Sequence, residues 1–321
     1  MKNWMIEKAI KKYHSIKKKR LDDRAGFKKV PQREAYLMED ILTVEEKKHY
    51  CERKAYSQLK YFPNLDNPKS FNEKIIWLAL NYKNPIIAKC TDKYEMKRHI
   101  ASIFGEDKYY VKALGIYTNI NDIPFDELPS KFVIKSTAGW GSKQVIIVKN
   151  KETANLDKIK SRVAEWLYPW NTYYYNNMCI TDEKIKPRIL IEEYLEDLDG
   201  LKDYKLYCFN GEPKMALTVI NRGNDKEQRR VFTDIDEWKV LPFTRNKIKS
   251  EENVEKPQEL ETMINIAKQL SKEVPMLRVD FFINKGKIYV GEMTFSPGMF
   301  LRIRPKEWDF KLGEWLNIKD I

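Results

Sequence analysis

Hydrophobic and polar positions follow a helical spacing in the first third of the chain. Apolar residues recur every three or four positions over residues 2–20, and helical patterns return over about 34–60 and 70–82. Ser70 with Glu73 three residues later has the capping-box pattern that marks the start of a helix. We therefore expect a helical section at the front of the protein.

Short β-runs follow, and a helix predicted over about 257–272 interrupts them. The runs cover residues 109–117, 132–135, 144–148, 188–195, 204–209, 213–220, 229–235, 277–283 and 287–295. This order predicts mixed α/β lobes behind the helical front. Because 321 residues exceed the usual size of one domain, we expect two or three packed lobes.

The composition is that of an ordinary globular protein, with 42% hydrophobic and 33% charged residues. No stretch approaches the roughly 18 apolar residues that a membrane-spanning helix needs. The first residues are basic but lack the apolar core and cleavage site of a secretory signal. The sequence therefore predicts a cytoplasmic protein.

The net charge of +12 is concentrated at one end of the chain. Residues 1–33 carry twelve Lys and Arg against three acidic residues, so 12 − 3 = +9 lies there and about +3 remains for the rest. An excess confined to one end is not a nucleic-acid-binding surface distributed over a fold. The basic, amphipathic segment 2–20 suits peripheral contact with the anionic inner face of a membrane or with an acidic partner, or it is a solvated helix packed on the body.

Cysteine and histidine offer little chemistry. The four cysteines are far apart, without metal-binding or disulfide spacing, and are expected to be reduced, buried thiols. The histidines all fall in the first third of the chain. Carboxylates, lysines and arginines are therefore the candidates for chemistry in the later lobes.

A glycine-containing loop over residues 136–143 joins two β-runs. Gly139, Gly141 and Ser142 would let backbone N–H groups surround phosphate oxygens, and Lys135 and Lys143 supply positive charge. The loop lacks the spacing of a Walker loop or a dinucleotide fingerprint. A plain hairpin turn is the alternative interpretation.

Asp280 and Glu292 lie on the two arms of a predicted hairpin with Gly286 near its centre. A three-residue loop over 285–287 would place the two carboxylates opposite each other on one face, about 5 Å apart. Such a pair repels unless a divalent cation lies between, and hard oxygen ligands of this kind are what Mg²⁺ prefers. A solvent-exposed hairpin edge is the alternative, although the apolar neighbours favour the interior of a sheet.

The segment 188–195 reads as a buried strand that runs into a polar bend. A strand that leaves the core beside a phosphate loop can pair its backbone with the edge of an adenine ring. Glu196 or another carboxylate would then reach the ribose hydroxyls. By itself the segment predicts a strand and nothing more.

The order and spacing of these three features resemble the ATP-grasp superfamily. The resemblance implies an α/β (α+β) ATP-grasp fold with two α+β lobes clamping ATP, preceded by a helical basic N-terminal region. It implies that the nucleotide is bound by Lys93 of an Asp-Lys pair and by Lys135, Gly139, Gly141, Ser142, Glu192, Glu193, Tyr194, Leu195 and Glu196. Asp280 and Glu292 would hold Mg²⁺, and Thr294 stands where the family usually has an Asn ligand.

More narrowly, the chain resembles the TupA-like ATP-grasp group of bacterial polysaccharide biosynthesis. The matching stretches are 70–74, 128–129 with 132–135, 203–211, 278–280 and 291–295. The implied regions are a basic extension (1–60), a pre-ATP-grasp region (61–125), a nucleotide lobe (126–200) and a C-terminal lobe with the metal site (201–321). The implied activity joins an amine to a carboxylate on a cell-surface glycan or its precursor.

The implied mechanism forms an acyl phosphate from ATP and the carboxylate, which the amine then attacks. Catalysis is then positioning plus neutralisation of phosphate charge, by Mg²⁺, Lys93, Lys135 and the loop amides. The candidates to hold the substrate carboxylate are the cations near the metal hairpin. They are Arg278, Lys205, Arg302 and Arg304.

Three other functions remain open from the sequence. A glycosyltransferase would use the acidic triplets 234–236 or 197–199 to bind the metal of a nucleotide sugar. A kinase on the same fold would transfer phosphate to a hydroxyl, and a scaffold would catalyse nothing. An aromatic cluster over residues 166–175 is either core packing or a platform for sugar rings.

Overall fold

The computed structural model describes residues 43–139, 144–168, 185–196, 202–220, 229–245, 253–300, 302–319 and 321. The predicted basic helix over 2–20, Gly141, Ser142, Cys179, the acidic triplet 197–199 and most of the aromatic cluster lie outside these ranges. None of the helices in the described part is long and apolar enough to cross a membrane.

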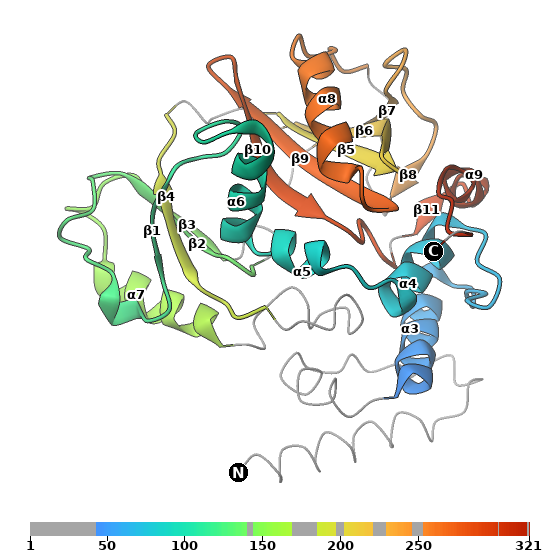
Figure 1. The fold of residues 1–321 in the computed structure, drawn as a ribbon, viewed down its shortest axis with the longest axis horizontal. Helices are drawn as coiled ribbons and strands as arrows, with labels where there is room; N and C mark the ends of the chain where they lie inside the picture. Colours follow the sequence, from blue (N-terminus) through green and yellow to red (C-terminus); the bar gives the residue numbers. More distant parts are fainter. Residues whose placement is uncertain are drawn as a thin grey trace. The chain divides into compact units, whose positions relative to one another are not determined.

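Seven α-helices lie in the described ranges (Figure 1). They are α3 (Val44–Leu59), α4 (Phe71–Asn81), α5 (Pro85–Thr91), α6 (Lys93–Phe104), α7 (Leu156–Ala164), α8 (Leu260–Ser271) and α9 (Glu307–Trp315). Short 3-10 turns, η1 (Ile120–Asp122) and η2 (Glu165–Leu167), accompany them. The predicted helices over 70–82 and 257–272 are confirmed by α4 and α8, whereas α5, α6, α7 and α9 were not predicted.

The chain forms two compact units, and neither is one continuous stretch of sequence. Unit 1 contains the described residues up to Pro63, Ala79–Ala88 and Leu114–Glu192. Unit 2 contains Asn64–Leu78, Lys89–Ala113 and Glu193–Ile321. The predicted regional boundaries at residues 60, 125 and 200 stay a prediction.

Unit 1 is built on a four-stranded sheet with the order β1-β4-β2-β3. Its strands are β1 (Ala113–Tyr117), β2 (Phe132–Ser136), β3 (Val145–Val148) and β4 (Ile189–Glu193). Helix α7 packs against this sheet, because Val163 shares a buried cluster with Phe132, Ile134, Ile189 and Ile191 (Figure 1). The cluster buries one face of the strands that carry the candidate nucleotide residues.

Unit 2 is built on a five-stranded sheet with the order β10-β9-β5-β6-β7, and every pair is antiparallel. Its strands are β5 (Asp203–Phe209), β6 (Glu212–Ile220), β7 (Arg229–Asp234), β9 (Met276–Asn284) and β10 (Lys287–Thr294). Helix α8 lies against this sheet (Figure 1) and buries Met263, Ile266, Ala267 and Leu270, which recur at helical spacing. Each predicted β-run thus contains a strand, while the small pair β8 (Thr244–Arg245) and β11 (Ile303–Arg304) was not predicted.

Helices α4 and α9, more than 200 residues apart in sequence, are joined in unit 2. The predicted capping box forms, because Ser70 N donates to Glu73 Oε2 at 2.9 Å and Glu73 N donates to Ser70 Oγ at 3.2 Å. Beside it, Asn72 N and Nδ2 donate to Asp309 Oδ1 of α9 at 3.0 and 3.1 Å. Gly313 of α9 lies so close to the backbone before α4 that an added Cβ would be 2.1 Å from Lys69 O.

Cys51, Cys90 and Cys208 are buried, as predicted. Burial raises the pKa of the Cys90 and Cys208 thiols to about 12. A thiol with so high a pKa is a poor nucleophile at neutral pH.

Gly313→Ala is expected to destabilise the protein. Alanine favours a helix over glycine by about 1 kcal/mol, but a Cβ against the Lys69 carbonyl forces the backbones apart, at a typical cost of about 2–3 kcal/mol. Urea unfolding should show a net loss of about 1–2 kcal/mol. Lys311→Ala, an exposed change in the same helix, is the control and should change the free energy of unfolding by less than about 1 kcal/mol. An equal or higher midpoint for Gly313→Ala would contradict the close contact.

Candidate active site

The β9–β10 hairpin turns through two residues. Lys287 pairs with Asn284, and Lys285 and Gly286 have φ of 50° and 74°, the left-handed values of a type I′ turn. The predicted three-residue loop is therefore wrong. Lys285 adopts a backbone conformation that the sequence pattern assigned to Gly286 alone.

The predicted partnership of Asp280 and Glu292 is nevertheless confirmed, for a different reason. Val290 pairs with Phe281, but Glu292 pairs with Asp280, so Gly291 is an extra residue in a β-bulge. Without this bulge Gly291 would lie opposite Asp280, and Glu292 would face the other side of the sheet. The bulge thus brings the two carboxylates together.

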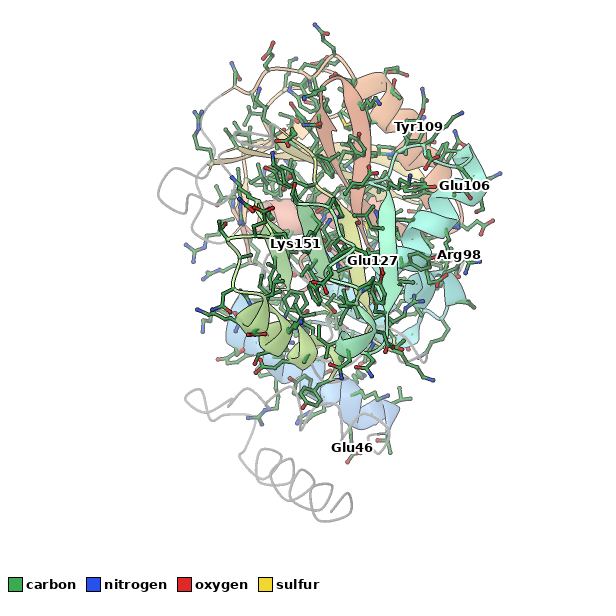
Figure 2. The ribbon with its side chains drawn as sticks, turned by 90° about the vertical axis from the view of Figure 1, so that its left-hand side faces the viewer. Glu46, Arg98, Glu106, Tyr109, Glu127 and Lys151 are labelled. Atoms are coloured by element: carbon green, nitrogen blue, oxygen red, sulfur yellow. The ribbon has the colours of Figure 1, made fainter. Side chains whose placement is uncertain are left out.

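Strand β10 lies at the edge of its sheet, not in the interior that its apolar residues favoured. Ile288 and Val290 are nevertheless buried, and helix α6 contacts β10. The loop after α6 covers the edge, since Val290 N donates to Tyr109 O at 2.7 Å. Figure 2 shows Tyr109 on this loop, with Arg98 on α6.

Two cations hold the Asp280 carboxylate. Arg278, two residues earlier on β9, donates from Nε to Oδ1 and from Nη2 to Oδ2 at 2.8 Å. Lys205 on β5 lies directly across from Asp280 and donates to Oδ2. The three side chains are largely buried, with 10% of Asp280, 16% of Arg278 and 15% of Lys205 exposed.

The charges in this cluster stabilise one another. Burial opposes ionisation of Asp280, but the positive charges and hydrogen bonds of Arg278 and Lys205 outweigh burial and lower its pKa. Burial likewise disfavours the Arg278 guanidinium, and Asp280, together with Tyr207 and Glu292, outweighs it and raises the pKa of Arg278. The carboxylate and the guanidinium are therefore both ionised at neutral pH.

Glu292 is the more accessible carboxylate, with 38% of its side chain exposed. Its Oε1 accepts a hydrogen bond from Thr294 Oγ1 at 2.8 Å and lies 3.6 Å from Arg278 Nη2. The Thr294 hydroxyl thus lies next to Glu292 and orients it. A direct contact of Thr294 with a metal stays a prediction.

The donor set fits a magnesium ion that is shared with a ligand. Asp280, Glu292 and Thr294 offer hard oxygen atoms on adjacent strands, which suits Mg²⁺. In the part of the chain that the structure describes, no group of three or more His, Cys, Asp or Glu side chains could hold a metal. The remaining oxygen ligands would come from phosphate groups and water, which is how Mg²⁺ is usually held with nucleotides.

Lys135 and Glu192 form an ion pair between neighbouring strands β2 and β4 of unit 1. The Glu192 side chain is 2% exposed and that of Lys135 is 23% exposed, so the ammonium is the accessible partner. The next residue of β2, Ser136, has a buried hydroxyl with no hydrogen-bond partner among the described residues. Strand β2 thus ends with an accessible cation followed by a buried hydroxyl at the start of the glycine loop.

The base of the glycine loop is fastened to β4. Thr137 N donates to Arg188 O at 2.9 Å, and Arg188 N donates to Thr137 Oγ1 at 3.1 Å. Gly139 is closely packed, because an added Cβ would be 2.6 Å from Gln144 Oε1. The loop therefore begins from a rigid base.

The segment after β4 belongs to unit 2. Glu193 and Glu196 are exposed, and Tyr194 and Leu195 are half-buried. Glu193 N donates to Lys112 O at 3.1 Å, and Glu196 O accepts from Asn284 Nδ2 at 2.8 Å. Backbone contacts thus hold the predicted adenine-binding segment at both ends.

Lys93 is the first residue of α6. The Asp92 carboxylate caps this helix by accepting from Tyr94 N at 2.9 Å and Glu95 N at 3.0 Å. The Asp-Lys pair of the sequence is therefore a cap followed by a cation at a helix start. A buried lysine one turn later, Lys97, was not predicted, and its Nζ donates to Val111 O at 2.6 Å.

The predicted carboxylate-binding cations are not all brought together. Arg278 and Lys205 meet at Asp280, whereas Arg302 and Arg304 are exposed on the chain around β11. Within the described ranges no hydrogen bond or ion pair links Arg302 or Arg304 to the Asp280 cluster. Of the aromatic cluster, Trp166 is buried in the core of unit 1, as the packing interpretation expected, and Tyr168 is 50% exposed.

A model of the TupA-like ATPgrasp family matches residues 73–317. The chain belongs to the TupA-like ATP-grasp family. This membership confirms the resemblance and the ATP-grasp fold class that the motifs predicted. The matched range includes the hairpin of Asp280 and Glu292, the strand that carries Lys135, and Lys93.

The individual curated and solved proteins that resemble this chain have low sequence identity to it. The D-alanine--D-alanine ligase of Sulfurimonas denitrificans is 24% identical over 218 residues, which are 64% of this chain and 55% of that protein. The chain thus spans about half the length of this curated relative. The Bacillus anthracis D-alanine--D-alanine ligase complexed with ATP is 20% identical, with a TM-score of 0.40 and coverage of 70% of this chain and 57% of that chain. D-cycloserine synthetase DcsG is 14% identical, with a TM-score of 0.40 and coverage of 72% and 71%.

The Lys135–Glu192 pair is expected to be strongly coupled. Lys135→Met leaves a buried carboxylate without this cation and should lower the free energy of unfolding by about 3 kcal/mol. The double variant Lys135→Met with Glu192→Leu should lose about 2 kcal/mol less than the sum of the single changes. Urea unfolding of the wild type, the two single variants and the double variant gives this coupling energy.

The exposed pair of Lys268 and Glu212, 2.8 Å apart, is the matched control. Its side chains are 46% and 59% exposed, so the same cycle should give less than about 1 kcal/mol. Additive effects of Lys135→Met and Glu192→Leu would show that their ion pair contributes nothing to folding.

Proposed function

We propose that this protein is an ATP-dependent carboxylate–amine ligase that acts on a cell-surface glycan or its precursor. The observation that carries the proposal is the facing pair of Asp280 and Glu292 in a chain of the TupA-like ATP-grasp family. The similarity to a protein named D-alanine--D-alanine ligase supports the same class of reaction. Its substrates here would be a carboxylate and an amine, one of them borne by the glycan.

The proposed reaction has two steps. A carboxylate oxygen of the acid substrate attacks the γ-phosphorus of ATP, so that the bond to the β-phosphate oxygen breaks and an acyl phosphate and ADP form. The amine nitrogen then attacks the acyl carbon, and phosphate leaves as the amide forms. Mg²⁺, when bound, would neutralise charge on the phosphate oxygens.

The residues of unit 2 would work at the phosphate and acyl groups. Asp280 and Glu292 would hold the magnesium ion, with Thr294 orienting Glu292. Lys93 would contact phosphate oxygens at the start of α6. Arg278 binds Asp280 through Nε and Nη2, so its remaining N–H donors, on Nη1 and Nη2, would be the ones that contact the substrate carboxylate.

Lys135, the glycine loop and the segment 192–196 would hold the rest of the nucleotide. Lys135 and the amides of the glycine loop would contact phosphates. Glu192 would act through Lys135, because its buried carboxylate contacts that ammonium. Residues 193–195 would pair with the adenine edge, and Glu196 would reach the ribose.

The protein is proposed to work in the cytoplasm at the inner face of the membrane. The basic segment 2–20 would provide a peripheral contact there with the membrane or with the polysaccharide machinery. This placement suits an enzyme whose acceptor is a membrane-associated glycan precursor.

The glycosyltransferase alternative loses support at its described acidic triplet. Asp234 Oδ1 accepts from Glu237 N at 2.7 Å, and Oδ2 accepts from Lys239 N at 2.8 Å. Both oxygens therefore stabilise a turn, a structural role that explains the residue. A kinase would use the same nucleotide site, and it differs in the acceptor.

ATP with Mg²⁺ is expected to raise the midpoint of thermal unfolding, whereas UDP-sugars are not. Asp280→Asn and Glu292→Gln should remove most of the shift, because each takes one charge from the metal site. Asp236→Asn, in the alternative acidic triplet, is the control and should keep it. Protection by a UDP-sugar that is lost in Asp236→Asn would favour the glycosyltransferase.

Release of ADP in the presence of candidate acids and amines tests the reaction itself, with Glu292→Gln as the blank. Added hydroxylamine should trap the acyl phosphate as a hydroxamate, because it attacks the acyl carbon in place of the amine. Amino acids and uronic-acid-containing acceptors are the substrates to screen. ADP release that depends on an alcohol and yields no hydroxamate would instead identify a kinase.

A further inference from the structure

Each carboxylate of the Asp280–Glu292 pair is matched by a cation. Two carboxylates on β9 and β10 face two cations, Arg278 on β9 and Lys205 on β5. Asp203, whose Oδ2 lies 3.8 Å from Lys205 Nζ, adds a third carboxylate, so the formal charges sum to −3 + 2 = −1. A free divalent cation therefore meets only one net negative charge, and it must approach two largely buried positive charges.

Both oxygens of Asp280 already accept hydrogen bonds. Oδ1 accepts from Arg278 Nε, and Oδ2 accepts from Arg278 Nη2 at 2.8 Å and from Lys205 Nζ. A metal that binds Asp280 must share or displace these donors. Mg²⁺ gives up its own water reluctantly, so it needs strong replacement ligands.

The described side chains do not supply enough such ligands. No cluster of three or more acidic, His or Cys side chains suited to a metal occurs in the described ranges. The triphosphate of ATP would provide the missing oxygen atoms. It also brings negative charge, which Arg278 and Lys205 attract.

We propose that Lys205, together with Arg278, makes this site selective for a metal–nucleotide complex over the free metal ion. The inference rests on the proposed function, because it requires that ATP binds here. Lys205 then has opposite effects on two ligands, since it repels the bare cation and attracts the anionic complex. In this proposal Lys205 is a specificity-determining residue, whereas the sequence suggested a ligand of the substrate carboxylate.

Lys205 is the better residue to change. Arg278 contacts Asp280 and also lies 3.6 Å from Glu292, so its removal alters the positions of both carboxylates. Lys205 comes from a different strand, and its second acidic neighbour is Asp203, with Oδ2 at 3.8 Å. Lys205→Met keeps the buried stem and removes the charge, and Lys205→Arg keeps the charge.

The test measures binding of Mn²⁺ to the full chain by electron paramagnetic resonance, with and without a non-hydrolysable ATP analogue. Without nucleotide, Lys205→Met is expected to bind Mn²⁺ about 10-fold more tightly than the wild type. With the analogue, it should bind the complex about 10-fold more weakly. Lys205→Arg and the exposed control Lys268→Met should resemble the wild type in both measurements.

Tight binding of Mn²⁺ by the wild-type protein without nucleotide would overturn the proposal, and this measurement needs no variant. The proposal would also be overturned if Lys205→Met changed the affinity for Mn²⁺ alone and the affinity for the Mn²⁺–analogue complex in the same direction. A general loss of structure would weaken both affinities. If Lys205→Met does not unfold cooperatively, Lys205→Gln replaces it. If the complex binds as expected but no acid and amine release ADP, the ligase activity fails and this inference stands.

Discussion

The contact of Asp280 with Arg278 and Lys205 is the interaction on which the candidate site depends. A buried carboxylate is costly unless cations and hydrogen bonds compensate it. Here the compensation comes from the same strand and from the neighbouring strand, so it exists only when β5 and β9 pair in one register. The bulge at Gly291 then sets β10 so that Glu292 joins the cluster. The electrostatics of the site are thus a consequence of strand register.

The candidate nucleotide-binding residues of unit 1 follow the same rule. Lys135 is held by Glu192 across two strands of unit 1, and the carboxylate is the deeper partner. A cation whose position is fixed before a phosphate arrives needs little reorganisation when it binds, which is an advantage in electrostatic catalysis. In both units, therefore, an acidic side chain positions a basic one.

The rest of unit 2 supports the β9–β10 hairpin that carries Asp280 and Glu292. The edge of β10 is covered through Val290 and Tyr109, and the segment after β4 is tied to Asn284 beside the hairpin turn. Helices α4 and α9 are joined through Asn72 and Asp309. These contacts join distant parts of the chain within unit 2, and the first two reach the hairpin itself.

The sequence by itself determined the β-runs, helix α8 and the capping box at Ser70, because local periodicity and local spacing encode them. It predicted the partnership of Asp280 with Glu292 from a three-residue loop, whereas the bulge at Gly291 is what produces it. It did not determine the turn length, since Lys285 shares the left-handed conformation with Gly286. Helices α5, α7 and α9 were missed because they are short and few residues in each carry the periodic pattern. Helix α6 is as long as α8, but it buries a lysine, Lys97, among its apolar residues. Only the tertiary structure decided that Lys205, 75 residues before Asp280, lies on its carboxylate while Arg302 and Arg304 have no contact with it among the described residues. Strand order is a long-range property, and no local pattern reports which strands will be neighbours.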